Sequence, residues 1–471
     1  MSTNGYNSLI RHNSSMNTKW MKRLWEGRSL KREIKVAFFL ALPLMVGELS
    51  SILTGVAGTM MAGRLGAAPL AASGVAGVVF VFSMLFVWGS IRMLPTPVAE
   101  AHELRDGEKV RTLVGASLLM GLLLTVFCSV LLWIGTSYFH LLRQDPEVTA
   151  LSVQYLHIIV YSMPAVILFA VLVNLVDAFT FVRITMFISI GGLALDVGLN
   201  WLLIFGNAGW PAMGINAIAL NTGITHAVMC LALGFVLWKH PELNYFRSAS
   251  TSWKAIWDHT VHFIRQGIPS ALQMVVEFSA FGAGTILIGQ ISKTEQAAHQ
   301  IAINLISLTY VTIMGVSTAG MIRIGQALAY QNKARIVLAG LGTLFLGILI
   351  MSVPTIVFLF APGSVVGWYM EDPTVVGIAT TLVFMAGLFQ LADAAQATSI
   401  SLLRALNDIK IPALISFIAF WLIGLPLGYW LAMIQGWNAQ GIWVGYLVAL
   451  LIQATWFVYR FFQLLRTRSS F

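Results

Sequence analysis

The chain has 471 residues, of which 58% are hydrophobic and 10% are charged, and its mean hydropathy is +0.81. Soluble globular proteins carry about 25% charged residues, so this composition excludes that class. The formal net charge of +9 would suit a nucleic-acid partner if the basic residues clustered. They instead follow the ends of apolar segments, and we expect no nucleic-acid partner.

From the N-terminus onward, apolar runs recur along the whole chain. Each is about twenty residues or longer, enough to cross a ~30 Å hydrocarbon core as a helix. Twelve such runs lie near residues 36–60, 70–97, 112–135, 150–177, 186–206, 214–238, 262–290, 298–322, 336–360, 375–403, 412–433 and 441–465. The sequence therefore predicts an all-α integral membrane protein with twelve transmembrane helices.

Lysine and arginine gather on one side of these helices. Of the 28, 24 fall on the N-tail, the loops from an even-numbered to an odd-numbered helix, the adjoining helix ends or the C-tail. This bias places both termini in the cytoplasm and the helices in an inner (plasma) membrane, in contact with its lipids. Arg92, near the cytoplasmic end of the second helix, is expected to snorkel to the headgroups. No signal peptide is expected, because the apolar residues follow the charges and no cleavage site comes after them.

The two halves of the chain resemble each other. A shift of 226 residues carries Pro43 onto Pro269 and Gly89 onto Gly315. Six helices per copy is an even number, so both copies enter the membrane in the same direction and a pseudo-two-fold axis along the membrane normal relates them. We expect a cleft between two six-helix bundles. The boundaries we predict are a cytoplasmic N-tail at 1–35, bundles at 36–238 and 261–465, a cytoplasmic linker at 239–260 and a C-tail at 466–471.

Five acidic residues fall within the apolar runs. They are Glu48, Asp177, Asp196, Glu277 and Asp393. An acidic side chain at bilayer depth costs ~2.5–3.5 kcal/mol on insertion scales, and it marks an ion or proton pathway by default. Asp177 is close to a cytoplasmic helix end, where we expect it to reach water. The other four are deep.

Polar stripes in the second bundle accompany two of these acids, with spacings of three and four residues that place each stripe on one helix face. The stripes are Gln273 and Glu277 on the seventh helix, Gln300, Asn304 and Ser307 on the eighth, and Phe389, Asp393 and Gln396 on the tenth. We expect them to line one cavity. The cation-coupling residues we assign are Glu277, Asp393, Asn304, Gln300 and Gln273, and the residues lining the substrate cleft are Phe389, Gln396 and Ser307.

The residue types in this cavity do not decide which cation binds there. Carboxylate, amide and hydroxyl oxygens suit an alkali cation such as Na⁺ at Glu277 and Asp393, and no His or Cys spacing indicates a transition metal. A carboxylate removed from water can instead exchange protons. A purely structural role, in which hydrogen bonds neutralise the acids and hold helices together, is the remaining alternative.

The first bundle carries a weaker polar site. Asp196 and Asn200 share a face of the fifth helix, and Glu48 lies on the first helix. Glu48 is one turn from Ser51, the position that the repeat assigns to Glu277. Structural and functional interpretations of Glu48 are equally open. We find no catalytic constellation and expect neither an enzyme nor a bound cofactor.

Several segments resemble the multidrug and toxic compound extrusion (MATE) family, in particular its NorM branch. One is Leu42-Pro43 followed by the run Thr-Met-Met-Ala-Gly-Arg-Leu-Gly at 59–66. Another is Ala-Ala-His-Gln-Ile-Ala-Ile-Asn at 297–304. The others are Gln-Leu-Ala-Asp-Ala-Ala-Gln at 390–396, Leu-Arg-Ala-Leu-Asn-Asp at 403–408 and Gly-Leu-Pro-Leu-Gly at 424–428. Together the segments span about 36–465.

The resemblance implies an antiporter that exports structurally varied, often cationic organic compounds and is driven by inward flow of Na⁺ or H⁺. It implies a cation site built on Glu277 and Asp393, and it matches Asp196 and Asn200 to family positions. Two departures stand out. Gly58 occupies a position where the family often has an aspartate, and Phe389 replaces a common tyrosine.

We therefore predict a monomeric secondary multidrug antiporter that works by alternating access, in which cation binding biases the outward state. The alternative within transport is a lipid-linked precursor flippase, which would need a cleft rich in Lys and Arg and commonly has two further helices. A membrane enzyme would need a clustered His or Asp motif at the membrane surface. A channel would show single-channel current.

Overall fold

The computed structural model describes residues 28–139, 145–369 and 372–467, so most of the expected N-tail lies outside the described residues. Twelve of its helices are long and apolar enough to cross a membrane, which confirms the number predicted.

The first bundle consists of α2 (Arg28–Gly63), α3 (Ala67–Ile91) with α4 (Pro95–Glu103), α5 (Gly107–Ser137), α6 (Pro146–Ala178), α7 (Val182–Phe205) and α8 (Asn216–Lys239).

The second bundle follows two short pieces of the connector, a turn at Pro241–Leu243 and α9 (Asn244–Arg247). Its main helices are α10 (Trp253–Ile291), α11 (Lys293–Ala329), α12 (Lys333–Phe360), α14 (Pro373–Ala405) and α17 (Asn438–Thr467), with the short α13 (Pro362–Val366) before α14. One further span runs from α15 (Lys410–Phe417) through α16 (Leu425–Tyr429) to Ile434, with wide π turns at Ile418–Gly424 and Trp430–Ile434.

Two helices begin earlier than the sequence suggested. The first starts at Arg28, within the predicted tail. The seventh span starts at Trp253, within the predicted linker, because the Ser252 side chain caps it by accepting the backbone N–H of Ala255 at 3.1 Å. The sequence analysis placed both helix starts too late because these segments are polar and basic. A helix that projects beyond the lipid needs no apolar sequence.

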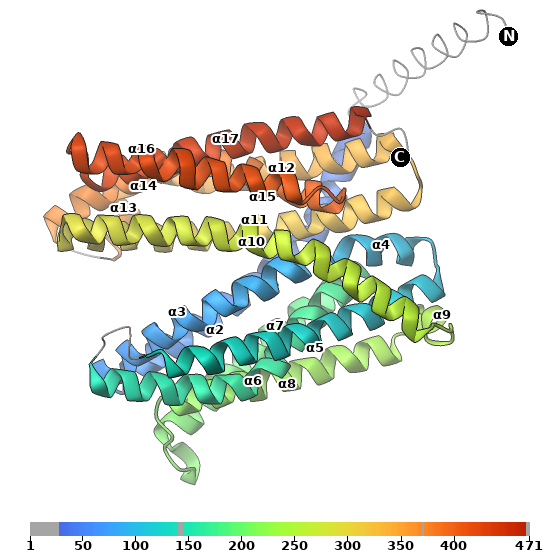
Figure 1. The fold of residues 1–471 in the computed structure, drawn as a ribbon, viewed down its shortest axis with the longest axis horizontal. Coiled ribbons are helices and arrows are strands. Elements are labelled where there is room, and N and C mark those ends of the chain that lie inside the picture. Colours follow the sequence, from blue (N-terminus) through green and yellow to red (C-terminus); the bar gives the residue numbers. More distant parts are fainter. Residues whose placement is uncertain (1–27, 140–144, 370–371, 468–471) are drawn as a thin grey trace, which may run out of the picture.

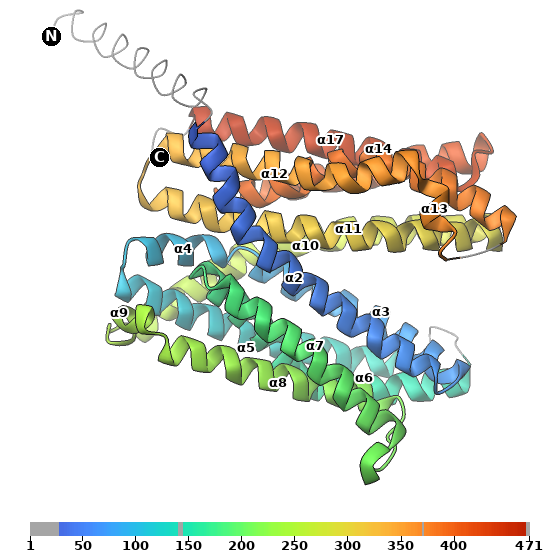
Figure 2. The ribbon, with the colours of Figure 1, turned by 180° about the vertical axis from the view of Figure 1, so that it is seen from behind.

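The bundles form two layers (Figure 1). In one layer lie α10–α17, and in the other lie most of α3 and α5–α8. The first helix of each bundle passes from one layer to the other: α2 packs on α11 and α12 as well as on α7, and α10 packs on α3 and α5 as well as on α15 (Figures 1 and 2). The bundles are thus exchanged at their first helices, which a division of the sequence into two halves does not show.

Glycines allow these crossings. A Cβ atom added to Gly89 on α3 would overlap the backbone of Ala271 on α10, and one added to Gly315 on α11 would overlap Met45 on α2. The shift of 226 residues relates these two contacts to each other. The internal repeat therefore appears in space as a pair of equivalent helix crossings, and the fold class predicted from sequence is confirmed.

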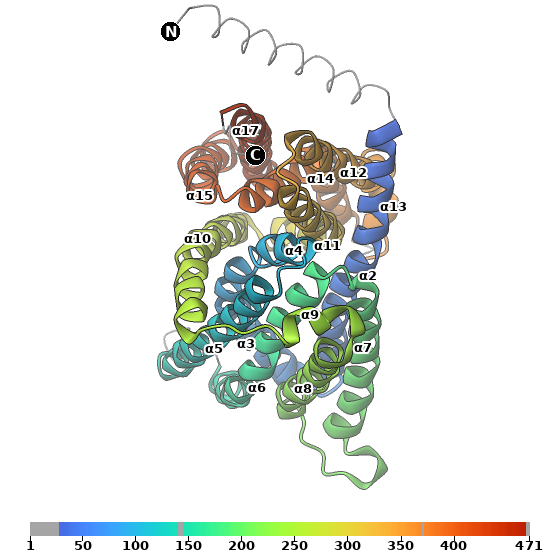
Figure 3. The same cartoon turned by 90° about the vertical axis from the view of Figure 1, so that its right-hand side faces the viewer.

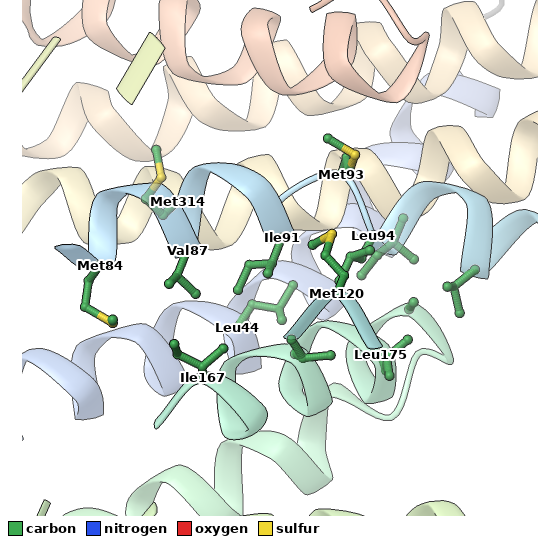
Figure 4. Close-up of a cluster of buried hydrophobic side chains, with 14 of the residues drawn as sticks. Leu44, Met84, Val87, Ile91, Met93, Leu94, Met120, Ile167, Leu175 and Met314 are labelled. Carbon is green, nitrogen blue, oxygen red and sulfur yellow. The ribbon is translucent and has the colours of Figure 1, made fainter. Parts of the chain in front are cut away.

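We call the end of the molecule at Arg28 and Thr467 the terminal end. Toward it the two bundles share one core, in which Met314 of α11 packs with Val87, Ile91 and other apolar residues of the first bundle (Figure 4). Viewed from this end, α4 and α11 lie in the middle, with α2 and α10 on opposite sides (Figure 3). Toward the other end the two layers diverge (Figures 1 and 2).

Candidate cation-coupling site

The Glu277 carboxylate, near the middle of α10, is the centre of a hydrogen-bonded cluster. Its Oε1 accepts hydrogen bonds from Gln273 Nε2 at 2.8 Å, Gln396 Nε2 at 3.1 Å and Ser416 Oγ at 2.9 Å. Three helices, α10, α14 and α15, therefore converge on one carboxylate. Gln273 and Gln396 are brought to Glu277 as the polar stripes predicted.

Gln453, on α17, completes the cluster. Its Oε1 lies 3.1 Å from Gln396 Nε2 and 2.9 Å from Ser416 Oγ. Neither Gln453 nor Ser416 was selected from the sequence, because each is isolated among apolar residues and forms no stripe. The signal in the sequence is the Gln453 amide within an apolar run. The structure buries this amide fully, and a buried amide requires a hydrogen-bond partner.

Asp393, on α14, is the second acid of the site. It is 6% exposed, and its buried Oδ2 has no hydrogen-bond partner among the described residues. It interacts electrostatically with Glu277, and Tyr310 of α11 interacts with both acids. A buried carboxylate oxygen without a partner is destabilising by about 1–3 kcal/mol or more, so this oxygen is available to a proton or a small cation.

Two arginines lie next to this cluster. Arg92 and Arg404 line, with Glu277, Gln273 and Tyr310, a small enclosed cavity of about 10 Å³, which has room for about one water molecule. Arg404 also donates to Gln273 Oε1. The expectation that Arg92 snorkels to headgroups was wrong, because the turn after α3 directs its side chain inward against the second bundle.

The remaining residues predicted in the second bundle are dispersed. Gln300 and Asn304 contact each other at 3.4 Å, and with Ser307 they are exposed on the side of α11 that carries Gly315. Phe389 is only 1% exposed and stacks on Trp443 with ring centroids 5.7 Å apart.

The prediction that Phe389 and Gln396 line the substrate cleft therefore needs correction. The first is in the core of the second bundle, and the second belongs to the enclosed cluster around Glu277. The stripe that holds them faces the bundle interior. Helical periodicity showed which residues share a face but not which neighbour that face meets.

The first bundle holds a separate polar cluster around Asp196. Its carboxylate accepts from Asn200 Nδ2 at 2.8 Å and Asn221 Nδ2 at 2.9 Å, and Thr225 Oγ1 donates to Asn221 Oδ1 at 3.1 Å. Asn221 and Thr225 were missed, although their four-residue spacing is the same signal used elsewhere. Glu48 is not bonded into this cluster; it is exposed on α2, one turn beyond Met45.

Asp177 differs from its prediction. It is 3% exposed and accepts a hydrogen bond from Thr185 Oγ1 at 2.6 Å, so it ties the end of α6 to the start of α7. The sequence placed it near a helix end, which is correct, but neighbouring helices cover that end.

Buried acids inside two repeated bundles of apolar helices are typical of an integral membrane protein of the transporter class. The MatE family model matches the chain twice, at residues 43–202 and 269–430. These two matches cover more than half of the chain and follow the internal repeat. The chain belongs to the MatE family, as the sequence motifs suggested.

Relatives extend over nearly the whole chain. It is 29% identical over 442 residues to a probable multidrug resistance protein NorM of Rhizobium meliloti, covering 93% of this chain and 94% of the relative. It is 30% identical over 444 residues to a probable NorM of Brucella suis, covering 90% and 93%.

Solved structures share the fold. The eukaryotic MATE transporter AtDTX14 aligns with a TM-score of 0.83 at 21% identity over 93% of this chain and 98% of that one. A mutant of the Vibrio cholerae MATE transporter VcmN aligns with a TM-score of 0.84 at 16% identity over 94% and 99%. At these identities the match concerns the fold alone.

Proposed function

We propose that this protein is a secondary multidrug antiporter, which exports amphiphilic and often cationic organic compounds in exchange for H⁺ or Na⁺. The names of the NorM relatives support the substrate class. The main support for assigning Glu277 and Asp393 as the residues that bind the coupling cation is their burial in the second bundle. Glu277 is at the centre of a hydrogen-bonded cluster, and Asp393 has an oxygen without a partner among the described residues.

The arrangement of the bundles supports alternating access. They are in contact at the terminal end and diverge at the other (Figure 1). The distribution of Lys and Arg puts the terminal end in the cytoplasm. In this orientation the structure corresponds to an outward-facing state, and export requires a second state with the contact at the opposite end. Each chain carries both bundles and both acids, so a monomer suffices.

Hydrogen-bond chemistry at Glu277 favours the proton over Na⁺. The partners found among the described residues are N–H and O–H donors, and they all use Oε1. Such donors stabilise an ionised carboxylate but do not coordinate a cation. Protonation at Oε2 would leave them in place, whereas Na⁺ would require several amide groups to turn their oxygens inward.

Transport in proteoliposomes tests the function. Ethidium movement would be followed under an imposed pH gradient and, separately, an imposed Na⁺ gradient. We expect uphill transport under at least one gradient, and loss of that transport in Glu277→Gln and Asp393→Asn. The coupling assignment is wrong if both variants transport like the parent, and the antiporter proposal is wrong if neither gradient drives any drug.

A flippase for lipid-linked precursors is less well supported. Arg92 and Arg404 do supply two positive charges, but the cavity between them has a volume of only about 10 Å³. A pyrophosphate headgroup does not fit into it. Bilayer-reconstituted protein that moves such lipids but no drug would favour this alternative.

A further inference from the structure

Arg92 belongs to the first bundle but reaches into the second. It follows Ile91 at the end of α3, and its Nη1 lies 2.6 Å from Sδ of Met314 on α11. Its guanidinium lines the same small cavity as Glu277. The cavity is therefore complete only while the bundles are in contact at the terminal end.

Several charged or titratable side chains surround the Arg92 and Glu277 pair. Those on the packed elements are Glu48 of α2, Tyr310 of α11, and Asp393 and Arg404 of α14. Arg404 and Asp393 are in the same bundle as Glu277 and move with it. Glu48 is in the same bundle as Arg92. Of the two arginines in the cavity, Arg92 is the one whose distance from Glu277 must change when the bundles separate.

We propose that Arg92 is an inter-bundle counter-ion for Glu277, which holds the terminal end closed while Glu277 is ionised and releases it when Glu277 takes up its cation. This inference rests on the proposed function. Glu48, also in the first bundle, interacts electrostatically with Arg92 and stays on the same side when the bundles part.

If Arg92 acts in this way, cation binding shifts the equilibrium between the outward-facing and inward-facing states in a defined direction. A ligand shifts a two-state equilibrium only by its differential affinity for the two states. Neutralising Glu277 removes an attraction that exists only in the outward-facing state, so cation uptake favours the inward-facing state. This is the opposite of the bias expected from the sequence. It suits an exporter, because the cation binds from outside after the drug has left and is then carried inward.

Distances between the bundles test the proposal. Spin labels would be placed at Glu108→Cys, at the terminal end of the first bundle, and at Lys333→Cys, at that of the second, with Cys128 and Cys230 replaced by Ala. Electron paramagnetic resonance would give the label separation at mildly alkaline pH, at mildly acidic pH and with added Na⁺. For the parent we expect one short separation at alkaline pH and a longer population when the coupling ion is supplied.

Four single variants and one double variant separate the possible outcomes. We expect Arg92→Gln to raise the ratio of long to short separations about tenfold at alkaline pH, within the usual range of coupling between sites, and to abolish the response to the ion. Arg92→Lys should behave like the parent because it keeps the charge, and Arg183→Gln, on the exposed side of α7, should also change nothing. Glu277→Gln should reproduce Arg92→Gln, and the double variant should add nothing further.

A parental distribution and ion response in Arg92→Gln would overturn the proposal, as would additive effects in the double variant. If Arg92→Gln does not fold, Glu277→Gln carries the test, because an unchanged distribution in that variant has the same meaning. Drug transport is measured separately. A protein that responds to the ion but moves no drug would refute the proposed function and leave the inference standing.

Discussion

At the scale of single residues, the site depends on groups that lie far apart in the sequence. Glu277 Oε1 accepts hydrogen bonds from donors on α10, α14 and α15, and Gln453 Oε1 lies within hydrogen-bond distance of two of those donors, Gln396 and Ser416. A hydrogen bond to a charged group contributes about 1.5–3 kcal/mol. Loss of one donor is therefore expected to disturb the carboxylate without unfolding the bundle.

Ser416→Ala tests this directly. Removing the hydroxyl takes away one donor to Glu277, and we expect gradient-driven ethidium accumulation in proteoliposomes to fall about tenfold, in line with the worth of one such hydrogen bond. Ser352→Ala is the matched control, because Ser352 is half-buried on α12 and its hydroxyl donates within its own helix. Equal accumulation in the two variants would show that Ser416 has no part in the site.

At the scale of helices, the crossings at Gly89 and Gly315 set how closely the bundles approach. Each glycine lies against the backbone of the first helix of the other bundle. Forcing extra volume into a well-packed contact costs about 1–3 kcal/mol. Because these contacts join the bundles as the structure has them, a methyl group there should destabilise this arrangement relative to the proposed inward-facing state.

Gly89→Ala should open the crossing. We expect the labelling rate of a cysteine at Ser270, a fully buried neighbour of Ala271, to rise roughly tenfold because overpacking of about 1–3 kcal/mol shifts the open fraction by that order. The measurement is maleimide modification in a background without Cys128 and Cys230. Gly74→Ala, on the same helix with no atom near its added methyl group, should leave the rate unchanged. A rate for Gly89→Ala equal to that of Gly74→Ala would contradict the account.

At the scale of the whole molecule, two of the polar contacts between the bundles lie near the terminal end. Arg323 of α11 binds both carboxylate oxygens of Glu33 on α2, at 2.7 and 2.8 Å. Tyr330 donates its hydroxyl hydrogen to Glu103 at 2.5 Å. That hydrogen bond raises the pKa of Tyr330, so the hydroxyl remains protonated and able to donate above neutral pH. We expect the proposed separation of the bundles at this end to alter both contacts.

The Glu33 and Arg323 pair therefore affects transport through the balance of states. Arg323→Glu places two like charges together, and we expect drug transport to fall roughly tenfold, within the usual range of coupling energies. Exchanging the charges in Glu33→Arg with Arg323→Glu should restore part of it. Reversing the charge of Lys109, which pairs with Glu100 inside the first bundle, serves as the control. A double exchange that rescues nothing would show that the pair is not an inter-bundle contact.

Sequence patterns predicted the spans, the repeat and the acids, because helix length, apolar composition and burial of charge are local properties. They could not predict that α2 and α10 exchange between bundles, since this depends on packing between distant helices. Arg92 shows the same limit. Its position near a helix end suggested headgroups, whereas the turn after α3 directs it against Met314 and into the cavity that Glu277 also lines. The sites at Gln453 and Ser416 were missed because an isolated polar residue has no periodicity.

If Glu277 and Asp393 bind the coupling cation, neutralising either acid uncouples drug movement from the cation gradient, and a comparison of two transport modes measures this. In proteoliposomes, accumulation of ethidium against its gradient requires the cation, whereas exchange of labelled for unlabelled ethidium at equilibrium does not. We predict that Asp393→Asn and Glu277→Gln lose the gradient-driven accumulation and retain the exchange. Accumulation at the parental level in either variant would contradict the claim.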